Sequence, residues 1–240
     1  MDELAKANSL PWTKGMRVVA VDSLGLMAVD KPTGTLSHQN RKSDTGKALL
    51  KLDYDEALQA YVGDGIDPIY LLNRLDSATS GLLLMTANEA VRDKVLEAFE
   101  RKQVTKRYAA MVFGFARRGS PVWKDRLNVK RQHGGVRAET GGGLMAETRL
   151  LSAKPFPGTP AMSLLELQPI TGRTHQLRIQ CAKRGMPIVG DRTYGDFRKN
   201  KAIAASRKIK RLCLHCVETE LVYSIDGKRS RFKAKSSHPF

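Results

Sequence analysis

A nine-residue stretch, Asn73–Gly81, concentrates groups that can do chemistry directly before a short apolar run. It holds the cation of Arg74, the carboxylate of Asp76, three hydroxyl side chains and a closing glycine. The run Leu82–Thr86 that follows has the length and composition of a buried strand. A carboxylate fixed to the edge of a buried element is held rigidly, as catalysis requires. Composition alone favours a simpler interpretation, a polar turn ahead of a core strand, so other segments must decide.

The charge of the chain indicates its partner. Of 240 residues, 41 are Lys or Arg and 24 are Asp or Glu, which gives a net charge of +17. Such an excess favours a polyanion, because each phosphate neutralised by Lys or Arg releases condensed counterions. An acidic membrane surface would instead call for a basic amphipathic helix with exposed apolar residues or a lipidation motif, and the sequence shows no clear example of either. We therefore expect a nucleic acid, and charge alone does not separate RNA from DNA.

Other sequence features narrow the class of protein. No apolar run reaches the roughly 18 residues that span a bilayer, and Met1–Lys6 lacks the pattern of a secretion signal. We therefore expect a cytoplasmic protein that makes no membrane contact. Cys213 and Cys216 have the spacing of a zinc ligand pair. No second pair accompanies them and residues 212–217 read better as a strand, so we expect no metal site.

Three segments carry the start and stop signals of helices. The first covers about residues 43–61. The second follows Thr86-x-x-Glu89, which resembles a capping box, and has apolar residues at i, i+4, i+7 and i+8 on one face. The third begins at Thr174 and ends before Gly185, a residue typical of the position just after a helix.

Strand candidates outnumber these helices and do not alternate regularly with them. This favours an α+β fold with a mostly antiparallel or mixed central sheet and flanking helices. The last two strand candidates are joined by Asp226-Gly227, a pair typical of a two-residue hairpin turn. Residues 1–15 read as a flexible leader, because Pro11 and Gly15 interrupt it. No linker divides residues 16–240, so we expect one domain there, built as two lobes.

Two segments concentrate cations. Residues 117–143 are polar, basic and glycine-rich, which predicts a long hairpin or loop whose cations either meet phosphates or form an ordinary solvated face. Residues 198–211 are also strongly basic. The cations of the first segment are Lys124, Arg126, Lys130, Arg131 and Arg137, and those of the second are Arg198, Lys199, Lys201, Arg207, Lys208, Lys210 and Arg211.

The stretch Asn73–Gly81 resembles the signature of the RluA-type pseudouridine synthases, which convert uridine in structured RNA to its carbon-linked isomer. Four further segments resemble motifs of that family and occur in the family's order across about residues 17–217. One such motif is weak evidence, but five in order are hard to obtain by chance. The four segments are residues 106–110, Thr171–Arg178, Gly190–Gly195 and Leu212–His215.

The sequence departs from the family pattern in three respects. The family usually has His where Asn73 and Gln180 stand, and since neither is the main catalytic position, we expect activity to survive. We expect the replacement of these two histidines to affect which RNA substrate the protein prefers. Many relatives also carry a small N-terminal RNA-binding domain. The match here begins near residue 17, so we expect a short form that binds RNA through the basic surface of its catalytic domain.

The resemblance implies a pseudouridine synthase catalytic fold and a role for each motif residue. The reaction breaks the ribose–base bond and rejoins the turned uracil through carbon 5, and it needs no cofactor. Asp76 would either attack the sugar carbon or remove a neighbouring proton. Arg178 would keep Asp76 ionised, since a guanidinium stays charged and can hold a carboxylate bidentately. Tyr108 would stack on the uracil.

Four further residues are implied as substrate-binding. Arg74 would fill the gap left by an extruded uridine or hold a phosphate, and Thr79 would shape the turn that presents Asp76. Arg173 and His175 complete the set. Without the resemblance, Arg74 would be assigned to a surface salt bridge with Asp76, and His175 to a structural role.

The leading hypothesis is thus a monomeric pseudouridine synthase that acts on ribosomal or transfer RNA. One alternative is a non-catalytic RNA-binding or ribosome-assembly protein on the same fold, against which the intact set Asp76, Tyr108 and Arg178 argues. Another is a DNA-acting base-flipping enzyme such as a glycosylase.

Overall fold

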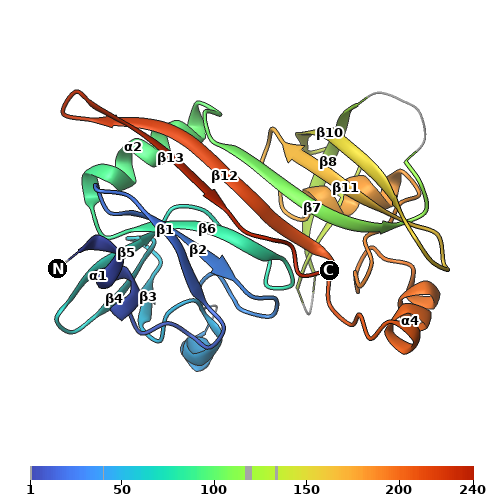
Figure 1. Cartoon of the computed structure of the whole chain (residues 1–240), viewed down its shortest axis with the longest axis horizontal. Coiled ribbons are helices and arrows are strands. Elements are labelled where there is room, and N and C mark those ends of the chain that lie inside the picture. The colour runs from blue at the N-terminus through green and yellow to red at the C-terminus, as the bar shows by residue number, and fades with distance from the viewer. Residues whose placement is uncertain (1, 40, 117–120, 133–134) are drawn as a thin grey trace. The chain divides into compact units, whose positions relative to one another are not determined.

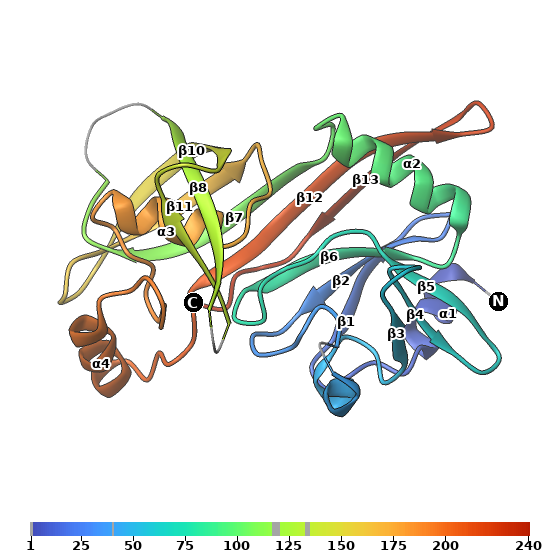
Figure 2. The same cartoon turned by 180° about the vertical axis from the view of Figure 1, so that it is seen from behind.

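The computed structural model describes residues 2–39, 41–116, 121–132 and 135–240, and it divides into two compact units (Figures 1 and 2). Unit 1 comprises Met1–Thr105 and Cys216–His238, and unit 2 comprises Lys106–His215 and Pro239–Phe240. Each unit combines antiparallel strands with helices, so the expected α+β fold in two lobes is confirmed. Within the described ranges, no helix is long and apolar enough to cross a membrane.

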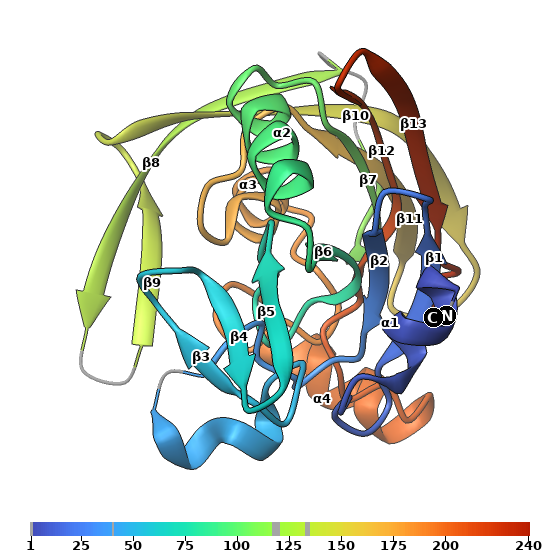
Figure 3. The same cartoon turned by 90° about the vertical axis from the view of Figure 1, so that its left-hand side faces the viewer.

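Unit 1 is organised around β6 (Ser80–Thr86), which can be followed among the other strands of this unit in Figure 3. All seven residues of β6 are buried. This confirms the strand expected after the Asp76 stretch. β6 pairs with β2 (Leu26–Lys31) over six residues and with β5 (Ile66–Leu71) at its last two, antiparallel in both cases. The other strands of this unit extend those pairs; they are β1 (Arg17–Val21), β3 (Asp53–Asp55), β4 (Ala60–Gly63), residues 216–225 of β12 (Leu214–Ile225) and β13 (Lys228–Lys235).

Helix α2 (Glu89–Glu100) lies where the apolar periodicity predicts it, with Val91, Val95 and Ala98 buried. Its cap differs from the expectation. The side chain of Asn88 accepts from the first N–H groups of the helix, whereas the Thr86 hydroxyl donates to Gly25 O and is used in the preceding turn. The helix therefore begins at Glu89, because an Asn side chain is as good a cap as a Thr hydroxyl.

The helix expected at residues 43–61 is wrong. The structure has a short 3-10 helix, η1 (Lys42–Lys47), followed by β3 and β4. Leu49 and Leu50 are both fully buried, and an extended segment places two adjacent side chains on its opposite faces. The Asp55 side chain then accepts from two backbone N–H groups and closes a turn.

The first 15 residues contain a helix that the sequence analysis did not predict. Helix α1 (Glu3–Ser9) buries Ala7. Trp12 Nε1 donates to Ala7 O at 2.8 Å, and the Trp12 backbone forms an isolated bridge with Leu50. These contacts attach the segment to unit 1.

Unit 2 is an antiparallel sheet with strand order β7, β11, β10, β8, β9. The hairpin of β8 and β9 confirms the long excursion expected in residues 117–143. The side chains of Lys130, Arg131 and Arg137 lie outside the part of the chain that the structure describes. The elements of this unit are β7 (Thr105–Phe113), β8 (Val122–Gln132), β9 (Gly135–Thr140), β10 (Leu144–Phe156), β11 (Met162–Pro169), α3 (Gln176–Lys183) and α4 (Phe197–Ser206).

Two local predictions in the second half of the chain are confirmed. Gly185 follows α3 with a φ of 71°, in the left-handed region that ends many helices. Asp226 and Gly227 have φ values of 49° and 75°, and they form the two-residue turn of the β12–β13 hairpin.

Candidate active site

The loop between β5 and β6 carries Asp76, and hydrogen bonds fix its backbone ahead of that residue. Asn73 Oδ1 accepts from Leu84 N at 2.8 Å, which ties the start of the loop to β6. Ser37 Oγ donates to Leu75 O at 2.8 Å and accepts from Leu75 N at 3.1 Å. Both backbone groups of the residue before Asp76 are thus paired with one buried hydroxyl.

A buried lysine fixes the backbone after Asp76. Lys31 is fully buried, and its Nζ donates to Thr35 O at 2.8 Å and to Pro32 O and Ser77 O at 3.1 Å each. Burial of an ammonium is costly unless it is hydrogen-bonded, and three carbonyls meet that need here. One of them belongs to the residue next to Asp76, so the cation holds the loop in place.

Gly81 marks the point where the loop enters β6. Its φ is 108°, and a Cβ built on it would lie 2.4 Å from both the backbone N and O of Cys216. Only glycine combines this conformation with so close an approach of another backbone. The glycine of the stretch is therefore required by packing in unit 1.

The other two predicted residues of unit 1 make different contacts. Arg74 is exposed, and its Nη1 donates to His38 Nε2 at 2.9 Å. The His38 ring stacks on Tyr54 with 4.8 Å between centroids. Thr79 is buried, and its N–H donates to Asp76 O at 3.0 Å, which closes the turn after Asp76.

In unit 2, Arg178 is held by a carboxylate. Its Nε and Nη2 donate to Asp191 Oδ2 at 2.8 Å and Oδ1 at 2.9 Å, and its guanidinium lies 5.1 Å from the centre of the Tyr194 ring. Burial alone would raise the pKa of Asp191, but the bonds from Arg178 and from two backbone N–H groups outweigh it and lower that pKa. An ionised Asp191 thus sets the plane of the guanidinium. Pairing of Arg178 with Asp76 stays a prediction.

Helix α3, which carries Arg178, begins one residue later than expected. His175, and not Thr174, is its cap residue, with a φ of 54°. His175 Nδ1 lies 2.9 Å from Tyr194 Oη, and the two rings meet edge to face. Tyr194 therefore contacts both His175 and Arg178.

The loop ahead of α3 is held by one buried amide. Gln176 Oε1 accepts from Thr171 Oγ1 at 2.7 Å and from Arg173 N at 3.0 Å. Its Nε2 donates to Glu147 O on β10 at 2.9 Å. The Arg173 side chain is exposed, with Nε donating to Met145 O at 3.2 Å.

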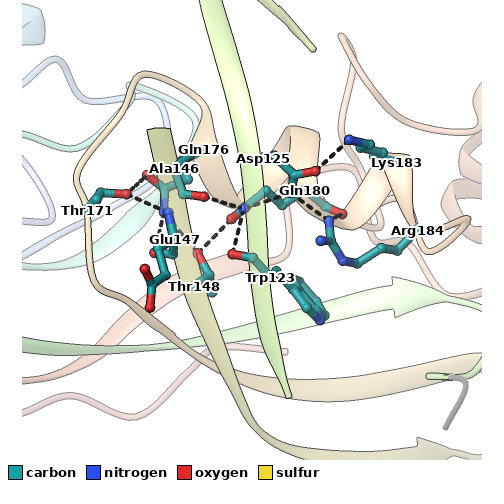
Figure 4. A network of polar contacts seen from close by, with 10 residues as sticks. All are labelled: Trp123, Asp125, Ala146, Glu147, Thr148, Thr171, Gln176, Gln180, Lys183 and Arg184. Carbon is teal, nitrogen blue, oxygen red and sulfur yellow. Dashed lines mark hydrogen bonds and ion pairs between the residues drawn. The ribbon is translucent and has the colours of Figure 1, made fainter. Parts of the chain in front are cut away.

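A second buried amide fixes α3 to the sheet of unit 2 (Figure 4). Gln180 Nε2 donates to Asp125 Oδ2 at 2.9 Å and lies 3.3 Å from Trp123 O and Ala146 O. Its Oε1 accepts from Thr148 Oγ1 at 2.6 Å. Gln180 therefore joins α3 to β8 and β10, and its contacts are structural.

Asp125 is the charged centre of this network. Lys183 Nζ donates to it at 2.6 Å and Arg184 Nη1 at 2.9 Å. Burial would raise the pKa of Asp125, but the bonds from Lys183, Gln180 and Arg184 outweigh that effect and lower the pKa.

Tyr108 is buried on β7, opposite Leu167 of β11, and Lys106 Nζ lies 5.7 Å from its ring centre.

Cys213 and Cys216 are buried thiols, and burial raises the pKa of Cys213 to about 12. Among the described residues no cluster of His, Cys, Asp or Glu could hold a metal ion.

The predicted residues thus fall into two groups. Unit 1 holds Arg74, Asp76 and Thr79, and unit 2 holds the other four, which are Tyr108, Arg173, His175 and Arg178. Sequence reasoning placed Asp191 and Tyr194 in a family-like motif but gave them no role. It gave Lys31 no role, since no local pattern shows that a lysine will be buried.

Comparison with known proteins gives a consistent result. Residues 25–183 match a family model described as RNA pseudouridylate synthase. The chain is 30% identical over 224 residues to tRNA pseudouridine synthase C of Yersinia pestis, a match that covers 90% of this chain and 84% of that protein. It is 33% identical over 214 residues to Ribosomal large subunit pseudouridine synthase C of Rickettsia felis, covering 88% of this chain and 64% of that one.

The fold is also found among solved structures. Human RNA Pseudouridylate Synthase Domain Containing 1 superposes with a TM-score of 0.63 over 95% of this chain and 85% of that one. The identity is 20%, so this likeness supports the fold alone.

Proposed function

Because the chain belongs to the RNA pseudouridylate synthase family and is therefore an isomerase that acts on uridine in RNA, we propose that Asp76 is its catalytic carboxylate. The observation that carries this proposal is the fixed backbone on both sides of Asp76, where Ser37 pairs with Leu75 and Lys31 holds Ser77 O. A carboxylate that must meet one sugar carbon or one proton needs such a rigid support.

The reaction breaks the bond between the ribose and uracil N1 and forms one between the ribose and uracil C5. A proton leaves C5 and another joins N1, so no cofactor is consumed. Asp76 either attacks the sugar carbon or removes a neighbouring proton. We assign Tyr108 to stacking on the uracil, and Arg178 to the ion pair that keeps Asp76 charged. The Asp191 carboxylate supports the second assignment, because it fixes how the guanidinium is presented.

The remaining predicted residues contact the rest of the RNA in this proposal. Arg74 and Arg173 are exposed cations suited to phosphates, Thr79 shapes the Asp76 turn, and His175 contacts the substrate beside Tyr194. The relatives' names indicate transfer RNA or ribosomal RNA as the substrate. We further propose that the protein acts in the cytoplasm as a monomer.

Tritium release from RNA labelled at uridine C5 tests the role of Asp76. We expect the Asp76→Asn variant to lose at least about 10³-fold in rate while RNA affinity stays the same. Asp64→Asn, an exposed aspartate in a turn of unit 1, is the matched control and should release tritium at the wild-type rate. Full activity of Asp76→Asn would refute the assignment.

Carbodiimide mapping of cellular RNA from a deletion strain identifies the substrate. Loss of pseudouridine from one transfer or ribosomal RNA would name it. An unchanged map, with no release by the purified protein, would support the non-catalytic alternative, which the comparisons do not favour. Release of tritium without loss of the base would exclude glycosylase activity.

A further inference from the structure

Helix α4 presents a rigid outer face on unit 2 (Figures 1 and 2). Its inner side buries Ile203. Asn200 Oδ1 accepts from Gly190 N at 2.7 Å, and Asn200 Nδ2 donates to Asp191 O at 2.9 Å. The helix is thus bonded to the same residue that holds Arg178, so its orientation is fixed relative to that guanidinium.

The outer face combines one aromatic ring with cations. Phe197 is 64% exposed, and Arg198 and Lys201 are also exposed. At 100° per residue these three side chains lie within one quarter to one third of the helix circumference, and Ala202 and Ala205 complete that face. A large exposed ring flanked by cations and small residues leaves room for a planar ligand to stack.

The cations of this face lack carboxylate partners within the described part of the chain. Across the described residues, no carboxylate lies within ion-pair distance of Arg198 or Lys201, nor of Lys208 and Lys210 just beyond the helix. By contrast, the two cations of α2 both have carboxylate partners: Arg92 pairs with Glu89 and Asp93, and Lys94 pairs with Glu97. The cap residue Arg101 also pairs with Glu97. Like charges one turn apart cost a helix a few tenths of a kcal/mol each, so the α4 face is complementary to an external polyanion.

We propose that the outer face of α4 binds a single-stranded or loop segment of the substrate RNA. Phe197 stacks on an unpaired base, and Arg198 and Lys201 contact the flanking phosphates. This inference rests on the proposed RNA substrate. An anionic membrane fits less well, because Phe197 is the one large apolar residue exposed on this ten-residue helix.

The binding test uses the full chain and two fluorescent probes, a mixed-sequence single strand of about 15 nucleotides and a duplex of the same sequence. For Phe197→Ala we expect roughly tenfold weaker binding of the single strand, little change for the duplex, and an unchanged dependence on salt. Phe197→Tyr keeps the ring and should bind as the wild type. Equal binding by Phe197→Ala, or an equal loss on the duplex, would overturn the stacking role.

The charge test removes Arg198 and Lys201 together. Since two phosphate contacts are lost, binding of the single strand should depend less on salt: the negative slope of log K against log salt should become smaller in magnitude by about 1.4. The control pair Lys228→Ala/Arg229→Ala, at the tip of the β12–β13 hairpin, removes the same charge and should change the slope by less than half of that. If the slope changes no more than it does in the control pair, the proposal that the outer face of α4 contacts RNA phosphates is refuted.

Two further measurements separate the competing outcomes. If the α4 variants lose binding to phosphatidylserine vesicles and keep RNA binding, the surface is a membrane contact and the proposal is wrong. Tritium release by the wild-type chain is measured in the same preparation. Its absence on every cellular RNA would refute the proposed function, whereas release combined with unchanged RNA affinity of the α4 variants would refute only this inference.

Discussion

Replacing Gln180 by glutamate tests whether one buried amide holds the polar network of unit 2. The substitution preserves shape and changes a single NH₂ group to oxygen. That group lies 2.9 Å from the carboxylate of Asp125 and 3.3 Å from two backbone carbonyls. When ionised, the introduced carboxyl faces three acceptors where the amide donated, and one of those acceptors is charged.

The expected cost depends on pH in a defined direction. Burial and the negative charge of Asp125 both raise the pKa of the introduced carboxyl, which in the unfolded chain stays near about 4.3. An acid whose pKa is raised by folding destabilises the protein progressively as pH rises from the unfolded value towards the folded one, by up to about 1.4 kcal/mol per pH unit. Buried glutamates reach pKa values of about 8.

The magnitude follows from these values and the contacts. The lost second N–H donor costs about 1 kcal/mol at any pH. The ionisation cost adds about 1 kcal/mol at pH 5 and about 5 kcal/mol at pH 8, if the folded pKa is near 8. We therefore expect a loss in unfolding free energy of about 2 kcal/mol at pH 5 and about 6 kcal/mol at pH 8.

Urea unfolding at several pH values between 5 and 8 measures this difference. The chain has two tryptophans, and in a Trp12→Phe background Trp123 alone reports on unit 2. The pKa of Asp125 is lowered by folding, so the stability that its charge contributes is lost only below the unfolded value near about 4, outside this window.

Gln180→Leu is the uncharged control, and it should lose about 2–4 kcal/mol independently of pH, because it leaves several buried polar atoms unpaired. If Gln180→Glu unfolds with the same free energy at pH 5 and pH 8, or within about 0.5 kcal/mol of the parent, the amide does not hold the network and the reasoning fails.

Two further substitutions test the supports of the candidate site. Asp191→Asn should destabilise unit 2 by about 3–5 kcal/mol in urea, because Arg178 keeps a buried charge without its carboxylate. It should also remove the part of the acid-side stability loss that occurs below about pH 4, since the pKa of Asp191 is lowered by folding. Gly81→Ala should cost at least about 3 kcal/mol by thermal unfolding, because its Cβ would overlap the Cys216 backbone and its φ is 108°. An alanine variant with wild-type stability would show that β6 and β12 can separate freely.

Local signals predicted the elements that depend on local causes. The apolar run at Leu82–Thr86 became β6, and the one-sided periodicity of residues 91–99 became the buried face of α2. Asp226-Gly227 formed its hairpin turn, because both residues tolerate a positive φ. In each case the segment's own pattern and its tertiary surroundings favour the same structure.

The features that the sequence did not predict depend on contacts between residues that are distant along the chain. Residues 43–61 show helix-like signals, but Tyr61 Oη accepts from Leu49 N and donates to Ser37 O, and the segment forms a short 3-10 helix followed by short strands instead. The pairing of Arg178 with Asp191 joins a helix to a loop 13 residues later, and periodicity does not show it. Burial of Lys31 depends on three carbonyls that only the folded loop brings together.

The departures from the family pattern at Asn73 and Gln180 fall on supporting positions in both units. Each side chain bonds to backbone or to buried polar groups, and neither contact requires a charged ring. Both the oxygen and the nitrogen of the Gln180 amide have hydrogen-bond partners. In the Asn73 amide, Oδ1 accepts from Leu84 N, but Nδ2 is buried without a partner among the described residues. An unpaired buried donor costs about 1–3 kcal/mol. The loop that presents Asp76 is therefore less completely satisfied than helix α3, which carries Arg178. Of the two departures, the one at Asn73 is thus expected to have the larger effect on how firmly the Asp76 carboxylate is held.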